Sequence, residues 1–125
     1  MGGVESTLME KQTESFRNAL QGLYYTFRNE RNFRIHLVSG LVVYFLAWVY
    51  KLSPTELAIL TLTVFLVLTV ELVNTTIEAL VDRLAEGEHA HFAKISKDVA
   101  AAAVLTTSLG AALVGLLIFA PKIFS

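Results

Sequence analysis

The chain has 125 residues, of which 54% are hydrophobic and 17% are charged, and its mean hydropathy is +0.58. This composition is too apolar for a small soluble protein and indicates a membrane protein with a single domain over 1–125. The absence of cysteine excludes disulfides, thiolate metal sites and a cysteine nucleophile, and the net charge of −1 argues against a nucleic-acid partner.

The first predicted element is an amphipathic helix over about 13–30. Apolar residues recur every three or four positions from Phe16 to Phe27, and polar and basic residues such as Arg28 occupy the opposite side. Such a helix suits the membrane interface, with its basic side toward the lipid headgroups. The residues before about Lys11 are polar, and we expect them to be frayed.

Three apolar stretches follow, over about 33–50, 54–83 and 93–120, and each is predicted to cross the membrane. A serine cap followed by proline and glutamate at 53–56 is a strong helix-start signal for the second span. Pro121 is expected to end the third. The predicted fold class is therefore an all-α membrane protein with three transmembrane helices and an N-terminal interfacial helix.

The basic residues predict how these helices are oriented. Of the ten Lys and Arg residues, only Lys51 and Lys122 lie at the far ends of the spans. The others flank the near ends, and loops rich in Lys and Arg face the cytoplasm. The N-terminus is therefore expected in the cytoplasm and the C-terminus outside.

The second span carries a polar face toward its C-terminal end. Glu71, Asn74, Glu78 and Asp82 follow one another at steps of three or four, which places them on one side of the helix. Acids on a membrane helix are costly and indicate a functional site, although they can also serve only to fix helix packing. At about 1.5 Å per residue, Glu71 lies about 26 Å past Pro54, near the inner edge of the hydrocarbon.

Charges from the other predicted helices arrive at the same cytoplasmic level: Glu30, Arg34, Lys94, Lys97 and Asp98. A partly desolvated glutamate suits a general base. Glu30 and Glu78, if brought together, would supply oxygen ligands to Mg²⁺, and the lysines would offset phosphate charge. This inventory fits phosphoryl transfer, although the sequence contains neither a P-loop nor the glycine-rich loop of protein kinases.

The pattern Glu71-x-x-Asn74-Thr75-x-x-Glu78-x-x-x-Asp82, followed by Lys94-x-x-Lys97-Asp98, resembles the small prokaryotic diacylglycerol kinase/undecaprenol kinase family. Phe16-x-x-Ala19-x-x-Gly22-Leu23 and Glu30-x-Asn32-Phe33-Arg34-Ile35-His36 match the family as well, so the resemblance covers about 14–120. It implies a homotrimeric lipid kinase of the bacterial cytoplasmic (inner) membrane. Its partners would be the lipid bilayer, a membrane lipid alcohol and ATP, with Mg²⁺ as cofactor and the active site on the cytoplasmic side.

The resemblance also implies a role for individual residues. Glu71 would be the catalytic base that takes the lipid hydroxyl proton, and Asn74 would support the reacting centre. Glu30 and Glu78 would hold Mg²⁺. The remaining matched residues would bind the lipid or the nucleotide: Arg34 the lipid, and Asp82, His89, Lys97 and Asp98 the nucleotide.

The residues at 32–36 resemble those of the Gram-positive branch of the family more closely, so undecaprenol is the favoured acceptor and diacylglycerol the alternative. In contrast, the loop from Asp82 to Lys97 is a residue longer than in the Gram-negative diacylglycerol kinases.

Other interpretations remain open. Intramembrane acids also occur in ion or proton carriers, and a structural membrane subunit would need no chemistry. Glu30 with Arg34 has the spacing of an ordinary helix ion pair, as has Lys94 with Asp98. His36 is interpreted as an interfacial hydrogen-bonding residue.

An oligomer is expected because the polar face of the second helix would otherwise meet lipid. In the trimer, Glu71 and Glu78 of one chain are predicted to face the first span and N-terminal helix of another.

Overall fold

The computed structural model describes residues 2–86 and 90–125, which form four α-helices. They are α1 (Gly2–Asn29), α2 (Arg31–Val49), α3 (Pro54–Leu84) and α4 (Ala90–Ile123). The helices α2, α3 and α4 are long and apolar enough to cross a membrane. The predicted all-helical class with three spans is therefore confirmed.

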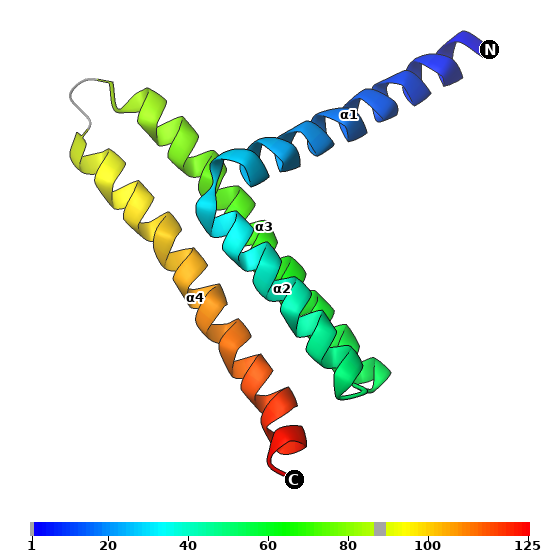
Figure 1. The fold of residues 1–125 in the computed structure, drawn as a ribbon. Coiled ribbons are helices and arrows are strands. Elements are labelled where there is room, and N and C mark those ends of the chain that lie inside the picture. Colours follow the sequence, from blue (N-terminus) through cyan, green and yellow to red (C-terminus); the bar gives the residue numbers. More distant parts are fainter. Residues whose placement is uncertain (1, 87–89) are drawn as a thin grey trace.

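The three long helices lie side by side, and α1 leaves them at a steep angle (Figure 1). Both α4 and α2 pack against α3, whereas α1 touches α2 and α3 over a short stretch. The α2–α3 turn and the C-terminus lie at one end of this bundle. The junction of α1 and α2 and the far ends of α3 and α4 lie toward the other.

Some helix limits differ from the sequence-based expectation. The segment expected to be frayed is helical from Gly2, because it contains good helix formers and no proline. The helix α4 begins at Ala90 and continues beyond Pro121 to Ile123. Pro121 removes only its own N–H donor, and the N–H of Phe124 still bonds to the carbonyl of Ala120 at 3.0 Å.

The start of α3 confirms the predicted capping signal. The Ser53 hydroxyl accepts from the N–H of Glu56 at 3.2 Å, and the Glu56 carboxylate accepts from the N–H of Ser53 at 3.0 Å. The preceding Lys51 turns the chain with φ of 51°. Lys122 near the end of α4 then pairs with Glu56 at 3.1 Å, which ties α4 to the start of α3.

A small apolar core lies at the same end of the bundle. Ala47, Leu60, Ile118 and Phe119 are buried together, and Tyr50 meets Phe119 edge to face with ring centres 6.2 Å apart. One residue from each of α2 and α3 and two from α4 thus close this end. The polar face of α3 lies at the opposite end, where α1 joins the bundle.

Candidate active site

The polar face of α3 passes from buried to exposed along the helix. Glu71 is 1% exposed, Asn74 is buried, Glu78 is half-buried and Asp82 is exposed. The Asn74 amide donates to the Glu78 carboxylate at 3.3 Å, so these side chains lie on one side of the helix. Because Glu71 and Asn74 are already buried within a single chain, their polar character alone does not require a second chain to cover them.

Two buried oxygens on this face have no hydrogen-bond partner among residues 2–86 and 90–125: Oε2 of Glu71 and Oδ1 of Asn74. His36 on α2 lies at ion-pair distance from the first, with its Nε2 3.7 Å from Glu71 Oε2. An unpaired buried acceptor costs about 1–3 kcal/mol. Such a cost at two neighbouring positions indicates a site kept for a function other than stability.

Glu30 lies at the junction of α1 and α2. Its φ of −108° and ψ of 108° are extended, so the chain changes direction there instead of continuing as one helix. Its carboxylate makes no capping hydrogen bond to α2, which leaves it available to the site. Glu30 and Glu78 both lie within electrostatic range of Glu71. These three acids therefore lie toward the same end of the bundle, where α1 joins it.

Arg34 does not pair with Glu30, so the interpretation as an ordinary helix ion pair is wrong for these two residues. Its guanidinium instead donates to the carbonyls of Phe27 at 2.7 Å and Arg28 at 3.0 Å. These carbonyls lie in the last turn of α1 and lack an N–H partner within the helix, so a cation is well suited to bind them. Arg34 thereby fixes the direction of α1 and, with it, the position of Glu30 between the helices.

The lysines expected at the site pair with acids near the C-terminal end of α3 and the N-terminal end of α4. Lys97 contacts Asp82 at 2.8 Å across the two helices. Lys94 contacts Asp98 at 2.7 Å along α4, which is the ordinary i,i+4 pair that the spacing allowed. His89, predicted to bind the nucleotide, lies outside the described residues.

The residues present fit a magnesium ion that takes most of its ligands from elsewhere. In the described part of the chain, no three His, Asp or Glu residues are grouped closely enough to hold a metal ion by themselves. Mg²⁺ commonly takes one or two carboxylates and completes its shell with water and phosphate oxygens. Glu30 and Glu78 are half-buried carboxylates, and Glu78 contacts the Asn74 side chain, whose Oδ1 has no partner among the described residues; this donor set suits such an ion.

The structure adds His36 to the site. The sequence alone predicts an interfacial, hydrogen-bonding role for this histidine and does not connect it with Glu71. A signal was present, because His36 lies near the start of α2 and Glu71 lies in the C-terminal half of α3, the next and antiparallel span. Residues at one depth on neighbouring helices can meet, but the sequence does not show which faces of the helices are opposed.

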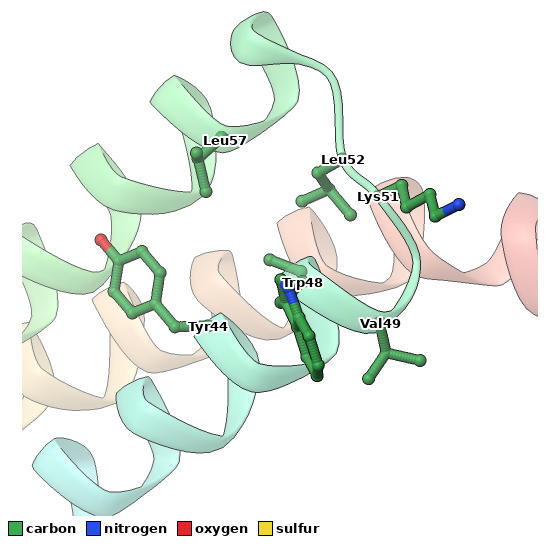
Figure 2. A pocket seen from close by; sticks show the side chains of 7 residues that line it. Tyr44, Trp48, Val49, Lys51, Leu52 and Leu57 are labelled. Atoms are coloured by element: carbon green, nitrogen blue, oxygen red, sulfur yellow. The ribbon is translucent and has the colours of Figure 1, made fainter.

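A hollow of about 740 Å³ lies far from these acids, at the α2–α3 turn (Figure 2). Its lining is mostly apolar and includes Tyr44, Trp48, Leu52 and Leu57, with Lys51 at the turn. It contains no acid. The hollow therefore lacks the acids that the sequence proposes for a site, which lie toward the opposite end of the bundle.

Comparison with known proteins shows which family the chain resembles. The sequence model of the family described as prokaryotic diacylglycerol kinase matches residues 17–119. A diacylglycerol kinase of Synechocystis sp. is 40% identical over 111 residues, which are 89% of this chain and 63% of that protein. An undecaprenol kinase of Bacillus subtilis is 37% identical over 110 residues, 88% of this chain and 89% of that protein.

The chain thus spans less than two thirds of the Synechocystis relative and most of the Bacillus one. The family model covers the acids on α3, the junction at Glu30 and the lysines on α4. The chain belongs to the prokaryotic diacylglycerol kinase family, a family of lipid kinases.

Proposed function

We propose that this protein transfers the γ-phosphoryl group of ATP to the hydroxyl of a membrane lipid alcohol, with Glu71 as the general base. The observation that carries the proposal is the Glu71 carboxylate, which is buried on a membrane helix with Oε2 unpaired among the described residues. Family membership supports the reaction class. The buried acid supplies a group able to accept a proton away from bulk water.

In the proposed step, the lipid hydroxyl oxygen attacks the γ-phosphorus. A new oxygen–phosphorus bond forms, and the bond from the γ-phosphorus to the bridging oxygen of ADP breaks. The hydroxyl proton passes to Oε2 of Glu71. Asn74 lies one turn away, where its amide donates to Glu78 and its own Oδ1 has no partner among the described residues, which supports a role beside the reacting groups.

Glu30 and Glu78 would hold Mg²⁺, which when bound offsets the charge of the nucleotide phosphates. Lys97 would contact the phosphates, with Asp82 keeping its ammonium group in place through the 2.8 Å contact. Asp98 and His89 complete the proposed nucleotide side. Positioning and charge neutralisation are what phosphoryl transfer mainly needs from a protein.

The proposal places this chemistry at the cytoplasmic surface of a bacterial inner membrane. The apolar side chains of α1, among them Phe16, Leu20 and Tyr24, are exposed in the single chain. A helix that leaves the bundle sideways with such a face exposed is suited to lie in the headgroup layer (Figure 1). There α1 would guide the lipid headgroup toward Arg34 and Glu71.

Undecaprenol is the proposed acceptor, supported by the resemblance at residues 32–36 and by the Bacillus undecaprenol kinase, most of whose length the chain covers. Diacylglycerol is the second candidate, favoured by the more identical Synechocystis relative. The homotrimer that the resemblance implies is also part of the proposal.

The test is phosphorylation of extracted lipids by the purified protein in detergent, with γ-labelled ATP and Mg²⁺. Undecaprenol, diacylglycerol and a lipid without a free hydroxyl are assayed side by side. We expect label in undecaprenol and a lower kcat/KM for diacylglycerol. The proposed function is overturned if no lipid alcohol accepts label, as expected for an ion carrier or a structural subunit.

A further inference from the structure

His36 and Glu71 form a pair whose two members differ in their access to the surroundings. His36 Nε2 lies 3.7 Å from Glu71 Oε2, which is ion-pair distance but longer than a direct hydrogen bond. The Glu71 side chain is 1% exposed, whereas that of His36 is 21% exposed. The imidazole thus stands between a buried carboxylate and the outside of the bundle.

A buried base must lose its proton before the next turnover. The neighbouring polar groups of α3 are not suited to take it. Thr75 donates its hydroxyl to the backbone carbonyl of Glu71 at 3.0 Å, and the Asn74 amide donates to Glu78. Among the described residues, His36 is the titratable side chain within ion-pair distance of Glu71, and imidazole exchanges protons readily near neutral pH.

His36 also faces a second space. It lines a cavity of about 340 Å³ between α2, α3 and α4, together with the hydroxyls of Ser39, Thr63 and Ser108. From α4 the cavity receives only uncharged small residues, and the other charged groups near Glu71 are Glu30 and Glu78 on the cytoplasmic side. His36 is therefore the one titratable side chain of this lining.

We propose that His36 is the proton-release residue of the kinase, acting through Glu71. This inference rests on the proposed role of Glu71 as base. After phosphoryl transfer, the Oε2–H bond of Glu71 breaks and an Nε2–H bond of His36 forms. The imidazolium then gives one proton to water in the headgroup layer, so both side chains return to their starting charge and no further reactant is needed.

The test compares wild type, His36→Gln and His36→Ala, with Ser39→Ala as the matched control from the same cavity. Gln keeps a side chain that can hydrogen-bond but does not titrate. We expect kcat of His36→Gln to fall about 100-fold, within the range for general acid–base groups, with KM for lipid and MgATP within about threefold. The pH profile of kcat should also change in His36→Gln, because the variant lacks the imidazole that passes the proton on.

Chemical rescue is the second readout. Added imidazole should restore His36→Ala at least about tenfold, more so as pH rises and neutral imidazole increases. It should not restore Glu71→Gln, and Ser39→Ala should keep the wild-type kcat and pH profile. If His36→Gln does not fold, the rescue of His36→Ala decides the question.

The inference is overturned if His36→Gln keeps the wild-type kcat and pH profile while Glu71→Gln is inactive. It is equally overturned if imidazole does not rescue His36→Ala, or if Ser39→Ala loses as much as His36→Gln. In those cases the lipid kinase function stands. If instead wild type phosphorylates no lipid alcohol, or Glu71→Gln stays active, the proposed function has failed and this inference fails with it.

Discussion

At the scale of single residues, the site depends on a carboxylate that the fold does not use for stability. Glu71 is buried with one oxygen unpaired among the described residues, whereas Asp82 on the same face is exposed and paired with Lys97. Burying an acid in this way is costly in a membrane helix. An apolar residue at position 71 would remove that cost, so its presence points to chemistry.

Glu71→Gln should abolish turnover while leaving MgATP affinity within a few-fold of wild type. The amide has nearly the same shape but cannot accept the hydroxyl proton, and loss of a general base typically costs about 10²–10⁴-fold in rate. Steady-state kinetics and nucleotide titration of the purified variant measure both quantities. Near-normal turnover would remove Glu71 as the base.

Glu30→Gln and Glu78→Gln should each weaken Mg²⁺-dependent nucleotide binding, and added Mg²⁺ should partly restore it. Each change removes one carboxylate ligand but leaves the other groups in place. Glu14→Gln on the exposed part of α1 is the matched control, because it makes the same change of charge away from the site. Normal MgATP binding by both site variants would contradict the metal assignment.

At the scale of helices, two contacts decide where these residues lie. Arg34 joins the end of α1 to α2 through the carbonyls of Phe27 and Arg28. Gly40 on α2 allows close approach to α3, since a Cβ there would stand 3.0 Å from Cγ1 of Val64. The close approach holds α2 near α3 about one turn beyond His36, and so helps to keep His36 beside Glu71.

Gly40→Leu should therefore lower the stability of the protein by about 1–3 kcal/mol, the usual cost of overpacking. Gly110→Leu on α4 is the control, because a Cβ at that position meets nothing within 4 Å. Thermal unfolding in detergent compares the two. Adding Val64→Ala to Gly40→Leu should recover part of the loss, and equal stability of the two glycine variants would refute the close approach.

At the scale of the whole molecule, polar groups gather toward the end of the bundle where α1 joins the spans. The opposite end is closed by the apolar core around Phe119 and by the Lys122–Glu56 pair. The apolar contacts that hold the helices together and the polar groups of the candidate site therefore lie at opposite ends of the molecule. Within one chain, Glu30 already acts electrostatically on Glu71, so the single-chain geometry predicts that these two acids of one chain work together.

Subunit mixing tests that statement. Inactive Glu71→Gln and Glu30→Gln chains are dissociated, mixed and reassembled at random in detergent. A site shared between chains at this pair predicts recovered activity, whereas the single-chain geometry predicts none, and we expect none. Two affinity tags confirm that the chains exchange, and recovery well above both parents would show that Glu30 and Glu71 of different chains form the site.

The sequence by itself determined the helices and the end of the spans at which the polar residues gather. Long uncharged stretches must span the membrane as helices, because the backbone has no other way to satisfy its hydrogen bonds there. The steps of three and four from Glu71 to Asp82 fixed a single polar face, and the Ser53 cap fixed where that helix begins. These features depend on neighbours in the chain, so local patterns predict them.

Only the tertiary structure decided which faces of the helices meet. In the structure, the Arg34 guanidinium donates to carbonyls at the end of α1 and does not pair with Glu30, and His36 lies beside Glu71. It also buried Glu71 and Asn74 within one chain, where the sequence argued for cover by another. Such contacts depend on how helices far apart in sequence are rotated and how they cross. When a helix is apolar on all sides, its hydrophobic periodicity predicts neither its rotation nor its crossing angle.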